Sequence, residues 1–227
     1  MSSLHSIQQT LIKLQEEEKI TTSQMVICLT IPLTKKRFLA EKNSSNWWSR
    51  LFCHSTDFAR NFSETFAEPY WVGEDGTGYE QRVALPVLQS LLTLNDETQV
   101  KIVPDCTFQQ LKDILDEENF RLLIILAHHY NERIEFAGGG VRIAKIKKLF
   151  ASFEKQLSLC LLVCESESTG MALKDSDVIR SLFSSPYELS VVHAAKFLVC
   201  WVKAIDCGKT LSQSYHEALH NYKSIST

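Results

Sequence analysis

Three short, continuous apolar runs constrain the fold of this chain more than any other feature of its sequence. They are MVICLTI at 25–31, LLIILA at 122–127 and LSLCLLVC at 157–164. Runs of this length without polar alternation are typical of strands that are buried on both faces of a parallel sheet. Helical patterns fill much of the chain around them, and strands that alternate with helices predict an α/β fold. We therefore expect a three-layer α/β/α sandwich with a mostly parallel central sheet of about four to six strands.

Apolar periodicity and capping residues predict where the helices begin and end. An N-terminal amphipathic helix is expected over residues 4–18, because four apolar side chains share one helical face: Leu4, Ile7, Leu11 and Leu14. Thr107 is expected to cap a helix that begins at Phe108. The remaining expected elements are helices at 82–93, 143–153, 187–205 and 209–223, a strand at 99–103 and a hairpin in RIEFAGGGVRI, 133–143.

Composition and charge exclude several classes of protein. The chain has 227 residues, of which 44% are hydrophobic and 22% are charged, as in ordinary globular proteins. Its net charge of −3 gives no reason to expect nucleic acid as a partner, and no apolar stretch is long enough for membrane insertion. The seven cysteines are odd in number and irregularly spaced, and the N-terminus lacks an apolar secretory core. We expect reduced thiols in a cytoplasmic protein.

Reactive side chains end two of the three apolar runs. His128 and His129 follow LLIILA, and Cys164 ends LSLCLLVC. The carboxyl ends of neighbouring parallel strands meet at one edge of a sheet, and the intervening 130–156 holds one helix, as a crossover would. A histidine near a thiol lowers the pKa of the thiol and can later protonate a leaving amine. The spacing predicts a Cys–His pair, and the alternative is that Cys164 only packs in the core.

The order of motifs from Thr107 to Gly170 resembles that of the CHAT peptidases, caspase-like cysteine proteases related to caspases, legumains and separases. The motifs that carry the resemblance are TFQQLKDIL, LLIILAHHY, IEFAGGG, IAKIKKLF and LLVCESESTG, in that order. CESESTGM is similar to the cysteine loop of legumains, and the tail FLVCWVKAIDCGKTLSQSYHEALHNY is similar to the closing helices of CHAT domains. The resemblance covers about 99–223. It implies one caspase-like domain over 1–227, in which 99–223 is the catalytic part and 1–98 completes the sheet.

The resemblance also implies an activity and roles for named residues. The chain would be an endopeptidase that cleaves a protein partner, with Cys164 as nucleophile and His129 as general base and acid. The family histidine follows "L-A-x", which places it at His129 with His128 in the variable position, and the doubled histidine leaves His128 as the alternative. Backbone N–H groups of Cys164 and Tyr130 would bind the oxyanion, although the family commonly has glycine where Tyr130 stands. Stand-alone CHAT proteases are often bacterial and act in defence, including antiviral defence, where they cleave a partner such as a pore-forming gasdermin.

Four acidic residues follow Cys164 within thirteen positions and suggest a preference for basic substrate residues. They are Glu165, Glu167, Asp175 and Asp177. A carboxylate in a pocket beside the nucleophile would favour Arg or Lys before the scissile bond, through a charge-assisted hydrogen bond. The alternative is that these acids are solvated in loops.

A competing motif lies in HEALH at 216–220. The i, i+4 spacing places His216 and His220 on one helical face with Glu217 beside them, as in zinc metalloproteases. A catalytic zinc needs a third protein ligand, and NYKSIST, which follows the motif, contains no His, Asp or Glu. We therefore expect neither a metal nor another cofactor. The first alternative to the protease is a non-catalytic caspase-like interaction module, and the second is a zinc hydrolase that acts through HEALH.

Overall fold

The computed structural model describes residues 10–13, 18–31, 85–116, 120–130, 132–163, 166–184 and 191–225. Its strands are β1 (Thr10–Lys13), β2 (Met25–Leu29), β3 (Lys101–Val103), β4 (Leu122–Ala127), β5 (His129–Tyr130), β6 (Arg133–Phe136), β7 (Gly139–Arg142), β8 (Leu157–Val163) and β9 (Ile179–Ser184). Its helices are the short 3-10 helix η2 (Thr22–Gln24), α5 (Leu85–Glu97), α6 (Phe108–Asp116), α7 (Ile143–Ala151), α8 (Glu167–Leu173), α9 (Val191–Asp206) and α10 (Leu211–Ile225).

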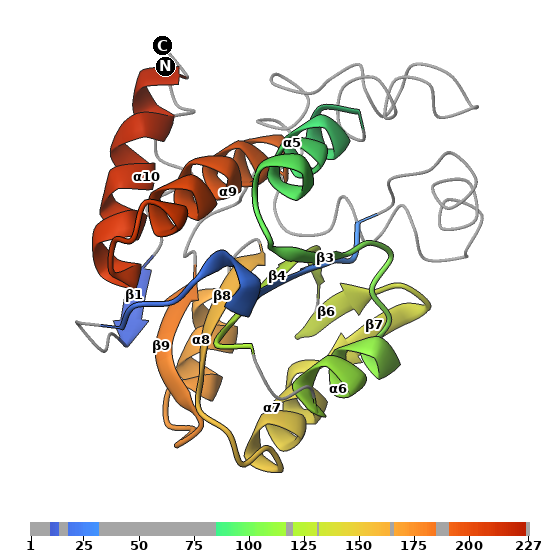
Figure 1. Ribbon diagram of the computed structural model, residues 1–227. Coiled ribbons are helices and arrows are strands. Elements are labelled where there is room, and N and C mark those ends of the chain that lie inside the picture. Colours follow the sequence, from blue (N-terminus) through green and yellow to red (C-terminus); the bar gives the residue numbers. More distant parts are fainter. Residues whose placement is uncertain are drawn as a thin grey trace, which may run out of the picture. The chain divides into compact units, whose positions relative to one another are not determined.

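The described strands form a six-stranded sheet in the order β1-β9-β8-β4-β2-β3. All of its neighbours are parallel except the edge strand β1, which is antiparallel to β9. Helices cover both faces: α6, α7 and α8 pack on one side, and α9 and α10 pack on the other (Figure 1). The predicted α/β fold with a mostly parallel central sheet is therefore confirmed. Its identity as a caspase-like fold stays a prediction.

The central strands read as continuous apolar runs because both of their faces are buried. Along β8, Leu159, Leu161 and Val163 join the core under α6, α7 and α8. Cys160 points to the other face, has no exposed surface and lies opposite Phe183 of β9. The ring of Phe183 contacts the aromatic rings of α9 and α10, with its centroid 5.1 Å from that of Trp201. Cys160 is therefore a residue of the core.

The N-terminal helix predicted over 4–18 is wrong where the structure describes it. Residues 10–13 form β1, in which Thr10 lies opposite Ser184 and Leu11 lies opposite Phe183. The pattern in this segment fits a helix locally, but the edge strand β9 offers unpaired backbone groups that a strand can satisfy. Pairing with a segment about 170 residues away along the chain outweighs the local periodicity.

The predicted hairpin is confirmed and belongs to a second, three-stranded sheet in the order β5-β6-β7. The predicted cap of α6 is also confirmed. Thr107 Oγ1 accepts a hydrogen bond from the Gln110 backbone at 3.1 Å, and the Gln110 side chain accepts one from the Thr107 backbone at 2.8 Å. This reciprocal pair satisfies two backbone donors at the start of the helix.

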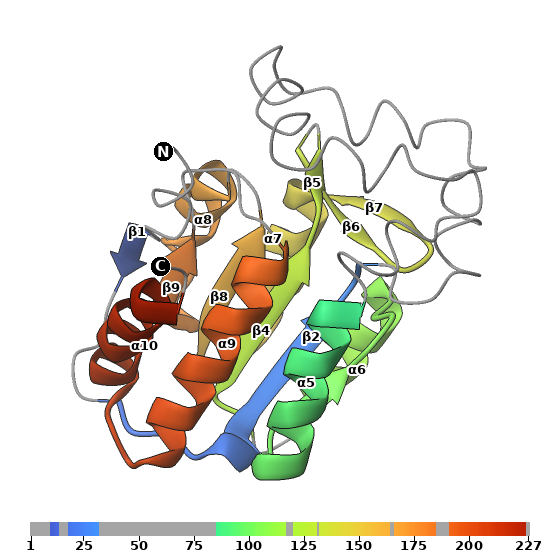
Figure 2. The same ribbon diagram turned by 90° about the horizontal axis from the view of Figure 1, so that it is seen from above.

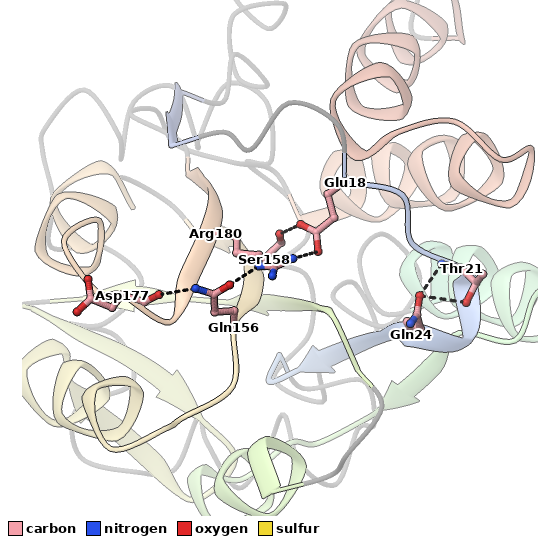
Figure 3. Close-up of polar contacts among 7 residues, drawn as sticks. All are labelled: Glu18, Thr21, Gln24, Gln156, Ser158, Asp177 and Arg180. Carbon is pink, nitrogen blue, oxygen red and sulfur yellow. Dashed lines mark hydrogen bonds and ion pairs between the residues drawn. The ribbon is translucent and has the colours of Figure 1, made fainter.

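A polar network fastens the segment before β2 to the amino-terminal ends of β8 and β9 (Figure 3). Ser158 Oγ donates to Glu18 Oε2 at 2.7 Å, and Arg180 lies 3.8 Å from Glu18 Oε1. Arg180 Nε also donates to Gln156 Oε1 at 2.7 Å, while Gln156 Nε2 reaches the Asp177 carbonyl at 3.5 Å. The Leu211 backbone donates to the Glu18 carbonyl at 2.8 Å, so the start of α10 joins the same network.

The chain separates into two compact units. One consists of residues 1–31 and 90–227, and the other of residues 32–89. Residues 32–84 lie outside the described residues, so the single domain over 1–227 stays a prediction. The sheet does contain β1 and β2 from the N-terminal portion, 1–98. Within the described ranges, no helix has the length and apolar character needed to cross a membrane.

Candidate active site

The predicted adjacency of the two histidine- and cysteine-bearing strands is confirmed. β4 and β8 are parallel neighbours, and their register runs from Leu122 opposite Ser158 to Ala127 opposite Val163. His128 follows the last β4 residue of this ladder directly. Cys164 follows the last β8 residue in the sequence, but Cys164 and Glu165 lie outside the described residues.

The short strand β5 determines how the two histidines are held. His129 lies opposite Ile134 of β6, and the Glu135 backbone donates to the His128 carbonyl at 2.9 Å. Directly opposed residues of an antiparallel pair share one face of the sheet, so the His129 side chain lies on the face of the fully buried Ile134. Both histidines are partly exposed, and the Nε2 atom of His129 is buried.

Cys106 connects the small sheet that carries His129 to the main sheet. The Cys106 backbone donates to the Leu29 carbonyl at the end of β2, at 2.8 Å, and its carbonyl accepts from Ala137 at 2.9 Å. A hydrogen bond to the Cys106 side chain, together with burial, raises the pKa of the Cys28 thiol well above its ordinary range. Both thiols are fully buried, which favours a packing role rather than nucleophilic chemistry.

Ser166 anchors the segment that follows Cys164, and the sequence analysis missed it. This side chain is fully buried, and its Oγ donates to the Leu161 carbonyl of β8 at 3.2 Å. The Ser166 carbonyl accepts a hydrogen bond from the backbone N–H of Gly170 in α8, at 2.7 Å. The hydroxyl therefore ties the start of α8 back to the strand that precedes Cys164. A serine two residues after a candidate nucleophile carries no signal in the sequence for such a return contact.

Two of the four acids of the predicted pocket lie far from the carboxyl end of β8. Asp175 and Asp177 are exposed in the turn that leads from α8 into β9. The next residue, Val178, accepts a backbone hydrogen bond from Leu157, the first residue of β8, at 2.8 Å. β8 has seven residues, so this turn lies about 20 Å from its carboxyl end. The prediction is wrong for these two acids because β9 is parallel to β8. The turn before β9 must therefore lie at the edge of the sheet where β8 begins, and not at the edge where β8 ends.

Two further residues were predicted to take part in the site, Glu167 and Tyr130. Glu167 is the first residue of α8, which begins shortly after Cys164. Tyr130 belongs to β5 and lies opposite Arg133. Their proposed roles, in the substrate pocket and at the oxyanion, stay predictions.

The HEALH motif lies on α10. His216 and His220 are exposed there, and Glu217 forms an ion pair with Lys209. No group of three or more His, Cys, Asp or Glu residues suited to a metal ion occurs among the described residues. The Tyr215 ring contacts the His216 ring, with centroids 5.7 Å apart, and also packs on Trp201 of α9. Within the motif, it is the fully buried Ala218 that belongs to the core, while the two histidines face outward.

No protein-family model matches this chain, and no curated protein matches it either. The resemblance to the CHAT peptidases therefore rests on the order of motifs in the sequence, and membership of that family stays a prediction.

Proposed function

We propose that the chain is a cysteine endopeptidase that cleaves a protein partner through Cys164 and His129. The observation that carries the proposal is the register of β4 and β8, in which Ala127 lies opposite Val163. Because both strands end at this pair, the chain segments that continue into the histidines and into Cys164 start from the same edge of the sheet. Catalytic groups in parallel sheets gather at this carboxyl edge.

In the proposed reaction, the Cys164 thiolate attacks the carbonyl carbon of a peptide bond. His129 holds the thiol proton and then gives it to the leaving amine, which leaves an acyl thioester on Cys164. Water then attacks this thioester, with His129 as general base, and releases the second product. Backbone N–H groups of Cys164 and Tyr130 would stabilise the negative charge on the carbonyl oxygen in both steps.

The other cysteines of the described part support this choice of nucleophile. The thiols of Cys28, Cys106 and Cys160 are fully buried. Burial also raises the pKa of the half-buried Cys200, although Lys203 opposes the shift. Cys207 is exposed and therefore provides a natural control for simple accessibility.

The test compares Cys164→Ala with Cys207→Ala in the purified full-length chain. Cleavage of a peptide library should disappear in the first variant and persist in the second. Iodoacetamide should label Cys164 much faster than Cys207, since a thiolate reacts and a thiol does not. Full proteolysis by Cys164→Ala would end the thiol mechanism. Slow, uniform labelling without cleavage by the wild type would favour the non-catalytic module.

A further inference from the structure

The exposed face of the small sheet carries two arginines directly opposite each other. Tyr130 lies opposite Arg133 on β6, and Arg133 lies opposite Arg142 on β7. Both arginine side chains are exposed. Like charges at directly opposed positions repel each other, and Glu135, which lies opposite Gly140 on the same face, offsets only one of the two positive charges.

The positive charge continues from this pair along α7 and onto α6. Arg142 precedes α7, and Lys145 and Lys148 follow at intervals of three residues along one flank of the helix. Lys145 Nζ lies 4.9 Å from the centroid of the Phe108 ring, and Lys112 Nζ of α6 lies 5.3 Å from the same centroid. Two ammonium groups from two helices therefore converge on one ring. The hairpin β6–β7, α7 and α6 lie together in both views (Figures 1 and 2).

We name this surface the basic stripe; its members are Arg133, Arg142, Lys145, Lys148 and Lys112. Glu135 lies on the same sheet face as Arg133, and Asp116 lies one helical turn beyond Lys112. From 137 to 153 the sequence contains no acidic residue at all. The centre of the stripe, at Arg142 and Lys145, is therefore positive within a chain whose net charge is −3.

We propose that the basic stripe docks an acidic segment of the protein that this chain cleaves. The inference rests on the proposed function and specifies the class of its substrate. Opposed guanidinium groups can bind carboxylates in a bidentate manner, and the three lysines supply point charges. The stripe begins at Arg133, opposite Tyr130, the neighbour of His129. Successive strand residues face opposite ways, so the docked segment would lie across the small sheet from the His129 side chain.

The test measures binding of a fluorescein-labelled, twelve-residue peptide of Glu, Asp, Gly and Ser to the full chain carrying Cys164→Ala. Arg142→Glu and Lys145→Glu should each weaken binding about tenfold at low salt, because each reversal replaces an attraction by a repulsion. Lys147→Glu is the matched control, because this exposed lysine lies on the opposite flank of α7. Equal weakening by all three variants would overturn the stripe and indicate diffuse charge. Tighter binding of an oligouridylate of the same length would overturn the choice of a protein partner.

The design separates this inference from the proposed function. Binding does not depend on cleavage, and Lys145→Glu should leave the cleavage of a short neutral peptide unchanged. Proteolysis without stripe-dependent binding would refute the docking surface alone. Stripe-dependent binding in the absence of any proteolysis would refute the protease and leave the basic stripe in place as a docking surface for acidic segments.

Discussion

Replacement of Glu18 by alanine should destabilise the protein far more than the loss of an ordinary surface carboxylate. The Glu18 side chain is only 7% exposed, and it accepts a hydrogen bond from Ser158, which is fully buried. It also pairs with Arg180, whose side chain is 30% exposed. Figure 3 shows that these contacts join the segment before β2 to both β8 and β9.

The expected magnitude follows from these contacts. A hydrogen bond to a charged group contributes about 1.5–3 kcal/mol, and a buried hydroxyl left without a partner costs about 1–3 kcal/mol. The partly exposed pair with Arg180 adds less than about 1 kcal/mol. Since these contributions overlap, Glu18→Ala should lower the free energy of unfolding by about 2–4 kcal/mol.

The assay is urea denaturation of the full chain followed by circular dichroism at 222 nm, with the slope of the transition compared between variants. Glu97→Ala is the matched control, because Glu97 pairs with Lys203 at 2.7 Å while both side chains are about half exposed. The control should lose less than about 1 kcal/mol, despite the shorter distance. In a double-mutant cycle, Glu18→Ala and Ser158→Ala should couple by about 1 kcal/mol or more. Equal losses for Glu18→Ala and Glu97→Ala would refute the argument from burial.

Three further predictions address the candidate site and its surroundings. His129→Ala should lower the rate of cleavage by roughly two to four orders of magnitude and His128→Ala much less; loss only at His128 would reverse their roles. Thr169 Oγ1 is buried and has no hydrogen-bond partner in the part of the chain that the structure describes. Thr169→Val should therefore raise the free energy of unfolding by about 1 kcal/mol. A lower free energy of unfolding for this variant, measured by urea denaturation, would contradict the prediction. Burial, and to a smaller extent Lys196, lowers the pKa of His193 below its ordinary 6.5. The unfolded chain then binds more protons than the folded chain, so stability is fully present above about pH 6.5 and declines as the pH falls below it. His193→Gln should reduce the dependence of stability on pH, measured by thermal unfolding between pH 5 and 8. An unchanged dependence would mean that other groups cause it.

Local patterns in the sequence were sufficient to predict the buried strands at the centre of the fold. The runs that became β2, β4 and β8 are apolar on both faces, and few other arrangements bury such a segment with its backbone paired. Thr107 and Gln110 satisfy the backbone at the start of α6 within a single turn, so the cap was visible without tertiary information. The adjacency of β4 and β8 followed from the crossover rule for parallel strands.

Long-range contacts decided what the sequence could not. Residues 10–13 became a strand only because β9 lies beside them, and β9 and α8 were not predicted as elements. The first turn beyond α8 carries Asp177 to the start of β8, so closeness in sequence to the last residue of β8 was a poor guide to closeness in space. Each of these features depends on a partner that is remote along the chain, and its energy is gained only when the sheet has assembled. Periodicity and spacing describe what a segment can form, whereas the pairing available at its final position determines what it does form.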